Sequence, residues 1–322
     1  MLARADLFKR RNNSLNWYKC SYDMGGTAAG VPPMRRGTMP APLQQDRQDD
    51  GYFGPDSVSW RVFSDPSAKL GGVAAILLQA LNPNMMRLFD QVSGYASDAA
   101  GRAERTGRYI DTTIFGDTAH ADAAGASVRR MHAASTWVDP ETGETLRADT
   151  AAWLAWTHNT VVWGVLRAAD LFGPALTTAE QDQLVREQHK AAELAGVDAA
   201  AIPATRAELD SYIEAQKGWM SLTLPAAELS RGMRSPSLWG NPVKVWSGII
   251  IQDGILALLP DWAQLLYGIA GRPMNLRAAA GTTRRLMAAA RKSSSYESVI
   301  TELTTRVDTH PYRKVRAKAP AQ

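Results

Sequence analysis

Apolar residues recur along this chain at the spacing of α-helices. The clearest stretch runs from Asp149 to Leu171 and closes with the breaker Phe172-Gly173-Pro174. Spacings of three and four residues place five of its positions on one face, namely Leu154, His158, Val161, Val162 and Val165. Because that periodicity is typical of an amphipathic helix, we predict one long helix here, capped by Asp149 or Thr150.

Start and stop signals divide the rest of residues 57–305 into further helices. Thr177 and Thr205 each precede a glutamate by three residues, which is the capping-box pattern. Ser64-Asp65-Pro66 predicts the start of a helix that ends near Asn82-Pro83. Other helices are expected at 106–114, 117–132, 219–232, 242–258, 260–269, 273–290 and 294–306, with a turn at 139–143. Strand-like alternation is scarce and no long period repeats, so the pattern predicts a single large all-α domain.

Composition sets the limits of that domain. Residues 1–50 are rich in Gly, Pro, Arg, Asn and Gln and lack periodicity, so we expect them to be disordered. The helical domain is expected to span residues 51–305, and residues 306–322 to form a basic tail. Since recognisable helical pattern begins only near Ser57, we hypothesise that the native chain starts at Met34 or Met39.

Positive charge is concentrated at the two ends. The formal net charge is +4, yet residues 1–38 carry seven Lys/Arg against two Asp, and residues 306–322 carry five against one. The body between them is therefore net acidic, which argues against a broad nucleic-acid-binding face. The oligomeric state is not indicated by the sequence.

The single cysteine, Cys20, excludes an internal disulfide and a multi-cysteine metal site. Neither Arg10-Arg11 nor Arg35-Arg36 is followed by the apolar segment of an export signal. The longest apolar stretch, Val73 to Leu78, is much shorter than a bilayer-spanning helix. We therefore expect a cytoplasmic protein without a stable membrane span.

Several catalytic motifs are missing from the sequence. It contains no dinucleotide-binding G-x-G-x-x-G after a strand, no Walker lysine loop, no H-E-x-x-H and no G-x-S-x-G. Histidine is the remaining candidate for cofactor or metal chemistry, and five are present. His189 in a charged helix is expected to be solvated, His310 lies in the basic tail, and His120 at a helix start is expected to be partly exposed. His158 on an apolar face is more often a hydrogen-bonded core residue than a ligand.

The stretch from Arg102 to His132 is the most informative part of the chain. A basic cluster with one threonine, Arg102-Ala-Glu-Arg105-Thr106, is followed by a helix that carries His132 near its end, after Val128-Arg129-Arg130-Met131. Imidazole can bind a metal or haem iron axially, and arginines are suited to holding carboxylates such as haem propionates.

These motifs together resemble the MpaB/latex-clearing (rubber) oxygenase family over roughly residues 59–290. The resemblance rests on short motifs in the family's order: Trp60-Arg61-Val62, Gly71–Pro83, Arg102–Thr106 with Tyr109 and Phe115-Gly116, Val128–His132, Thr145–Asp149, Trp156–Thr160, and Pro203 with Glu208-Leu209 and Tyr212. The resemblance implies an all-helical protein, globin-like in packing style, with an internal haem b pocket.

The resemblance also implies roles for individual residues. His132 would be the proximal ligand of the haem iron, with Arg102, Arg129 and His158 as further cofactor-binding residues. Arg105 and Thr106 would be catalytic on the opposite side of the haem, acting as hydrogen-bond donor and proton relay. The implied reaction is oxidation of a small hydrophobic substrate by dioxygen, with oxidative cleavage of a carbon–carbon double bond as the family chemistry. Trp153, Trp156, Trp163 and Met85-Met86 could line the hydrophobic pocket.

Some positions depart from the family, and alternatives stay open. Arg105 stands where latex-clearing enzymes have a lysine that could bind iron, and a guanidinium has no lone pair for that role. Asn82 replaces a frequent histidine, and Ser135-Thr136-Trp137 replaces a segment that often carries glycine. The arginines of the basic cluster could instead form ordinary salt bridges with Glu104 or Asp98. The chain could also be a haem-free helical protein that binds a hydrophobic metabolite, or a membrane-surface protein that uses its basic ends.

Overall fold

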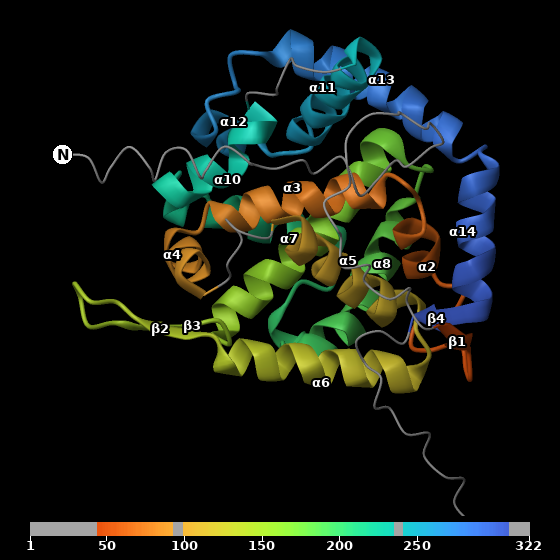
Figure 1. The fold of residues 1–322 in the computed structure, drawn as a ribbon, viewed down its shortest axis with the longest axis horizontal. Coiled ribbons are helices and arrows are strands. Elements are labelled where there is room, and N and C mark those ends of the chain that lie inside the picture. The colour runs from red at the N-terminus through yellow and green to blue at the C-terminus, as the bar shows by residue number, and fades with distance from the viewer. Residues whose placement is uncertain (1–43, 93–98, 235–240, 309–322) are drawn as a thin grey trace, which may run out of the picture.

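The computed structural model describes residues 44–92, 99–234 and 241–308, and helices dominate it (Figure 1). In chain order the α-helices are α2 (Val58–Phe63), α3 (Ala68–Ala80), α4 (Pro83–Val92), α5 (Ala99–Phe115), α6 (Thr118–Ala134), α7 (Ala151–Phe172), α8 (Thr178–Ala195), α9 (Arg206–Ala215), α10 (Leu224–Arg234), α11 (Pro242–Leu256), α12 (Asp261–Leu266), α13 (Pro273–Ala290) and α14 (Ser294–Thr305). Short 3-10 helices lie at Ala199–Ala201 and Gln216–Trp219. The strands are β1 (Gln44–Asp46), β2 (Thr136–Val138), β3 (Thr145–Arg147) and β4 (Arg306–Asp308). The predicted all-α domain is confirmed.

The centre of the fold is the close packing of α3 against α7. A Cβ atom added to Gly71 of α3 would lie 2.4 Å from the carbonyl oxygen of Gly164 in α7. The reverse distance, from a Cβ on Gly164 to the oxygen of Gly71, is also 2.4 Å. The two backbones therefore touch, which only glycine at both positions allows. Fully buried leucines such as Leu78 and Leu166 fill the core around this crossing.

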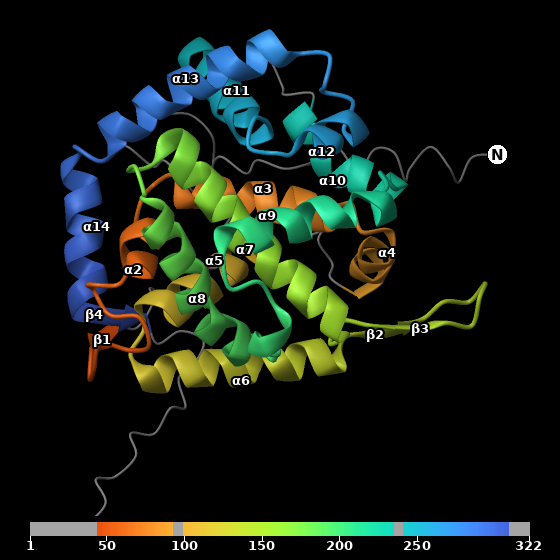
Figure 2. The same cartoon turned by 180° about the vertical axis from the view of Figure 1, so that it is seen from behind.

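The other helices surround the α3–α7 pair. Figures 1 and 2 show α6 along one side of the molecule and α11, α12 and α13 along the opposite side, while α14 closes a third side. A Cβ on Gly254 of α11 would lie 2.4 Å from the Thr283 hydroxyl of α13, so these two helices are also in close contact. Large side chains from several layers join one core, including Trp156, Phe172, Leu184, Leu209, Leu256 and Tyr267.

Helix starts follow the capping residues closely. Asp117 accepts the backbone N–H of His120 at 3.0 Å and begins α6, as predicted. The predicted capping box is complete at Thr177 and Glu180. Thr205 caps α9, but Glu208 accepts the N–H of Ala204 and not that of the cap residue. The predicted start at 64–66 is two residues early, because α3 begins at Ala68.

The ends of the described chain pair with each other. β1 and β4 are antiparallel, with Gln45 opposite Val307. Arg47 continues this contact: its guanidinium lies 4.9 Å from the centre of the Trp60 ring and donates to the carbonyl of Phe115. Folded structure therefore extends beyond the expected limits of residues 51 and 305. The expectations for residues 1–43, including Cys20 and the start at Met34 or Met39, and for 309–322 lie outside the described residues.

A β-hairpin follows α6 and projects from the body (Figures 1 and 2). β2 pairs with β3 antiparallel, with Trp137 opposite Leu146. The predicted turn is confirmed, since the N–H of Gly143 donates to the Asp139 carbonyl at 2.8 Å and Gly143 has a φ of 72°. The strands themselves were not predicted, because three residues are too few to show an alternating pattern. Arg87 of α4 holds the hairpin by a salt bridge to the buried Asp139.

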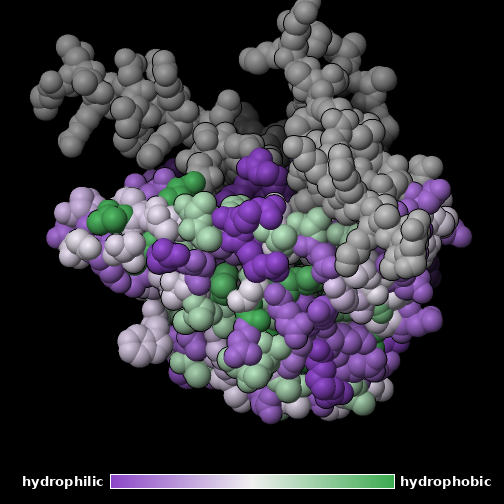
Figure 3. Space-filling model, turned by 90° about the horizontal axis from the view of Figure 1, so that it is seen from below, coloured by the Kyte–Doolittle hydropathy of each residue, from purple (hydrophilic) through white to green (hydrophobic). Residues whose placement is uncertain are grey.

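The outer side of α6 is a mixed surface. Figure 3 looks onto this side and shows polar and apolar side chains interspersed, with small apolar areas between polar ones. Ala121 and Ala124 of α6 are buried, whereas Arg130 and Met131 are exposed, as expected for a helix with one face on the core. Among the described residues, no helix is both long and apolar enough to cross a membrane.

Candidate functional site

The α5–α6 hairpin brings Arg102 and His132 to the same end of the two helices. Gly116 and Asp117 form the turn between these helices. Arg102 lies 14 residues before Gly116 and His132 lies 16 residues after it. At about 1.5 Å of rise per residue, both are roughly 21–24 Å from the turn. Packing of α5 against α6 therefore places them within electrostatic reach of each other, and Arg102 lowers the pKa of His132.

His132 is a partly buried histidine with an unpaired ring nitrogen. Its Nδ1 is shielded from solvent and has no hydrogen-bond partner. Burial is the main cause that lowers the pKa of His132, the charge of Arg102 lowers it further, and Asp149 acts in the opposite direction. The imidazole is consequently neutral at physiological pH and keeps a lone pair, which is the form that ligates a metal.

Arg102 faces the interior and is largely desolvated. Its guanidinium lies 4.2 Å from the centre of the Phe89 ring in α4. Burial, with a smaller contribution from Arg105, lowers the pKa of Arg102 to about 10. The side chain thus remains protonated at neutral pH, beside a neutral imidazole. A partly desolvated cation in this position is suited to an anionic group of a ligand.

Arg105 and Thr106 lie one turn further along α5 and are exposed. The Thr106 hydroxyl donates to the backbone carbonyl of Arg102 at 3.1 Å. Glu104, a possible salt-bridge partner of the arginine cluster, pairs with Arg108 at 2.7 Å. The other suggested partner, Asp98, lies outside the described residues. Helix geometry nevertheless keeps Arg102, Arg105 and Thr106 on one side of α5, because they are three and four residues apart.

Arg129 and His158 have other neighbours. Arg129 donates to the carbonyl of Leu194 at 2.6 Å, near the end of α8. His158 lies on α7, where burial and, to a smaller extent, the charge of His189 in α8 lower its pKa to about 4. The structure thus brings Arg102 to His132 and gives Arg129 and His158 different surroundings.

Two further histidines differ from their sequence-based expectations. His189 is only half-exposed and donates through Nε2 to the carbonyl of Pro203 at 2.8 Å, so the expected solvated side chain was wrong. His120 is 3% exposed and its Nδ1 lies 2.6 Å from a carboxylate oxygen of Asp117, so the expected partial exposure was also wrong. Periodicity could not reveal either contact, because both depend on how the chain turns at a helix end. His310 lies outside the described residues.

Two buried donors on α7 add to the interior polar groups. Trp156 and Asn159 are each 2% exposed. Trp156 Nε1 has no hydrogen-bond partner among the described residues, whereas the side chain of Asn159 is hydrogen-bonded to Tyr212 and acts to lower the pKa of that phenol. Trp156 was among the residues expected to line a hydrophobic pocket, but Asn159 was not singled out. Trp163, another of those residues, has its Nε1 bonded to Asp210 at 2.8 Å. A buried unpaired donor costs about 1–3 kcal/mol, so such atoms in a native fold call for an explanation.

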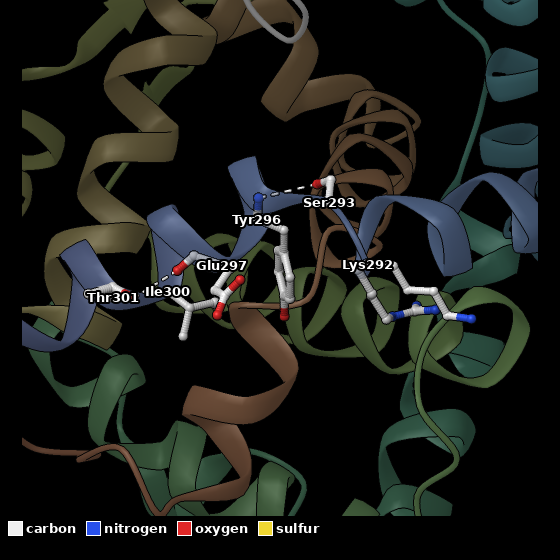
Figure 4. A pocket seen from close by; sticks show the side chains of 7 residues that line it. Lys292, Ser293, Tyr296, Glu297, Ile300 and Thr301 are labelled. Carbon is white, nitrogen blue, oxygen red and sulfur yellow. Dashed lines mark hydrogen bonds between the residues drawn. The ribbon is translucent and has the colours of Figure 1, made fainter.

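A shallow hollow lies elsewhere, where α13 meets α14 (Figure 4). Its volume is about 360 Å³, and Tyr296, Glu297, Ile300 and Thr301 of α14 line it. Its most basic side chain, Arg291, is already bound to Asp65. Figure 1 shows α14 on the opposite side of the molecule from the β2 end of α6, so this hollow is separate from His132.

Metal binding by protein ligands alone has no candidate in the described part of the chain. No group of three or more His, Cys, Asp or Glu side chains there could hold a metal ion. A single imidazole such as that of His132 can occupy one position of a metal whose other ligands come from a cofactor.

Comparison with known families gives one match over most of the domain. Residues 60–292 match the family described as "ER-bound oxygenase mpaB/B'/Rubber oxygenase, catalytic domain". That span runs from α2 to the end of α13 and includes all the candidate residues above. No curated protein and no solved structure matches the chain significantly. The chain belongs to the mpaB/rubber-oxygenase catalytic-domain family.

Proposed function

We propose that this protein is a haem b-dependent oxygenase that acts on an apolar organic substrate with dioxygen. The observation that carries the proposal is the buried, unpaired Nδ1 of a neutral histidine, beside a desolvated arginine, in an oxygenase catalytic domain. Bound haem would supply activation of dioxygen, and oxidative cleavage of a carbon–carbon double bond is the reaction that the family suggests.

The side chains around His132 fit haem on two counts. The neutral imidazole offers a nitrogen lone pair for an axial position, and its pKa is already lowered by its surroundings. Arg102 offers a protonated guanidinium for a propionate, and arginine binds carboxylates through paired hydrogen bonds. Binding a carboxylate would also satisfy the charge that now lies over the Phe89 ring.

In this proposal Arg105 and Thr106 form the catalytic side. The guanidinium of Arg105 has no lone pair with which to ligate a metal. It can donate hydrogen bonds toward the reacting oxygen, and the Thr106 hydroxyl can hold or pass on a proton. Both side chains are exposed. Arg129 and His158, which the resemblance also assigns to the cofactor, would support the site through the end of α8 and the core.

The visible absorption spectrum of protein expressed with haem supply tests the cofactor. We expect a Soret band in the wild type that is lost or shifted in His132→Ala. His189→Ala is the matched control, because His189 is a half-buried histidine bonded to a backbone carbonyl, and its spectrum should keep the wild-type position. A colourless protein that also refuses added haemin would refute the proposal and leave a haem-free binding protein as the better account.

Oxygen uptake tests the reaction itself. Haem-loaded protein should consume dioxygen with an unsaturated terpenoid or fatty acyl compound, and Arg105→Leu should lower the rate more than it changes haem content. If no unsaturated substrate supports oxygen uptake by haem-loaded protein, the oxygenase activity is refuted even though the cofactor is bound.

A further inference from the structure

Formal charge is distributed unequally over the folded part of the chain. Residues 217–292, which contain α10 to α13, carry ten Lys/Arg against three Asp/Glu, whereas residues 44–216 carry 14 against 24. Figures 1 and 2 show α11, α12 and α13 along the side opposite α6, and α10 packs against α11. One side of the molecule is therefore strongly basic, and most of the remaining described body is acidic.

The same side exposes large apolar side chains. Six of them are between 57% and 78% exposed, namely Trp219, Leu224, Val243, Trp246, Leu265 and Met274. The sequence of α11 is apolar around most of the helix, yet no residue from Val245 to Asp253 is buried. A helix that is apolar all round is normally enclosed by protein or by lipid. The described residues thus leave part of α11 without such a cover.

α13 presents apolar and basic side chains to the outside together. Its buried positions recur at a spacing of three and four residues, at Leu276, Ala279, Thr283 and Met287. Met274, Arg277 and Arg285 lie between or beside these positions and are exposed. Neither of the two arginines has a carboxylate partner among the described residues, unlike Arg61 of α2, which pairs with Glu180. Apolar residues beside uncompensated cations are typical of helices that lie in a membrane interface.

We propose that the α10–α13 surface, made of these exposed apolar and basic residues, docks on a membrane that contains anionic lipid. Its lysines and arginines meet the lipid headgroups, and its tryptophans and aliphatic side chains enter the boundary between headgroups and acyl chains. α11 has 15 residues, or roughly 22 Å of rise, which is too short for a hydrocarbon core of about 30 Å. The surface therefore lies on the membrane, and the acidic remainder of the body points away from the anionic lipid.

Other partners fit this surface less well. Nucleic acid would bind the arginines through its phosphates, but such contacts give no role to Val243, Leu265 or Met274. A symmetric dimer through the α10–α13 surface would bring two surfaces of like charge together, and these repel each other. Docking on a membrane does not depend on the proposed oxygenase function, because neither haem nor substrate takes part in it.

Flotation of the full-length protein with lipid vesicles tests the inference. The vesicles consist of phosphatidylcholine, with or without about 30% phosphatidylserine. Val243→Gln on α11 is matched by Val299→Gln on α14, because both valines are exposed and the two helices lie on different sides of the molecule. Arg277→Glu on α13 is matched by Arg186→Glu, which changes an exposed arginine of α8 in the acidic part. Circular dichroism checks that all four variants are folded.

We expect the wild type to bind vesicles with phosphatidylserine at least about tenfold more tightly than neutral vesicles, and added salt to reduce this preference. Val243→Gln should weaken binding about threefold and Arg277→Glu about tenfold, whereas Val299→Gln and Arg186→Glu should keep the wild-type affinity. Absence of binding to either kind of vesicle would overturn the inference.

Three other results would also overturn it. Binding that Val243→Gln and Arg277→Glu both leave unchanged would place the contact at the basic ends of the chain. An equal loss in Arg186→Glu would show that net charge alone accounts for binding. A wild-type oligomer that Val243→Gln dissociates, without any binding to vesicles, would assign the surface to a second copy of the chain.

Discussion

The contact between Gly71 and Gly164 allows a sharp test of the packing, because Gly72 provides a control on the same helix. A Cβ on Gly71 would lie 2.4 Å from the oxygen, 2.6 Å from the carbonyl carbon of Gly164 and 2.7 Å from the Cα of Val165. All three are backbone atoms that cannot rotate away. A Cβ on Gly72 meets no atom within 4 Å. The same substitution on adjacent residues should therefore have opposite effects.

The magnitudes follow from two opposing contributions. Replacing glycine by alanine inside a helix stabilises it by up to about 1 kcal/mol, so Gly72→Ala should be stabilised by roughly that amount. Gly71→Ala has the same gain but must separate α3 from α7 by about 1 Å. Overpacking of this kind costs about 1–3 kcal/mol or more, and contact with backbone favours the upper end. We expect a net loss of about 2 kcal/mol, and a difference of about 3 kcal/mol between the two variants.

Urea unfolding followed by circular dichroism measures this difference. At about 2–4 °C per kcal/mol for a domain of this size, the melting temperatures of the two variants should also differ by roughly 6–12 °C. Gly164→Ala should resemble Gly71→Ala, and the double variant should lose less than the sum, because the helices are separated only once. If Gly71→Ala is as stable as Gly72→Ala, the α3–α7 backbone contact is not as described and the reasoning fails.

Three other predictions concern charged and titratable groups. Burial lowers the pKa of His158 to about 4, so between pH about 6.5 and 4 the unfolded chain binds a proton that the folded protein does not. The free energy of unfolding should therefore fall by about 2 kcal/mol from pH 7 to pH 5. In urea titrations at the two pH values, His158→Gln should remove this part of the pH dependence. Arg291→Met should lose about 3 kcal/mol because it strands the buried Asp65 carboxylate, which Arg291 contacts at 2.5 Å; full stability of this variant would contradict that assignment. Asp117→Ala should lower the free energy of unfolding by about 2 kcal/mol, since the α6 cap and the partner of the buried His120 both disappear. In the same unfolding assay, Asp117→Asn should keep most of the stability.

Local sequence signals predicted most of the helices because their caps are local. Asp117 and Thr177 begin helices where the sequence indicates, and their hydrogen bonds join residues only a few positions apart. The signal at Ser64–Pro66 was misleading for a tertiary reason. Asp65 is used to accept the N–H and hydroxyl of Ser67 and to bind Arg291, which is 226 residues away in the chain. No local pattern contains that partner.

The site was predictable to a different degree. The resemblance singled out Arg102 and His132, and the lengths of the two helices either side of Gly116 bring them abreast. Asp149, which acts on the pKa of His132 from the start of α7, was expected only as a helix cap. The unpaired indole N–H of Trp156 could not be predicted, because a missing partner is a property of the whole packed interior.

The α5–α6 turn lies far from Arg102 and His132, yet its geometry determines which residues of the two helices face each other. A Cβ on Gly116 would lie 2.2 Å from the carbonyl oxygen of Thr112, and a Cβ on Gly51 would lie 2.1 Å from the carbonyl oxygen of Gly116, so the turn is fixed from both sides. Gly125, midway along α6, similarly allows the backbone of Leu194 in α8 to approach. A shift of one residue at such a fixed turn would rotate α6 by about 100° and move His132 away from Arg102. Rigid glycine contacts far from the imidazole therefore determine whether the two side chains share one site.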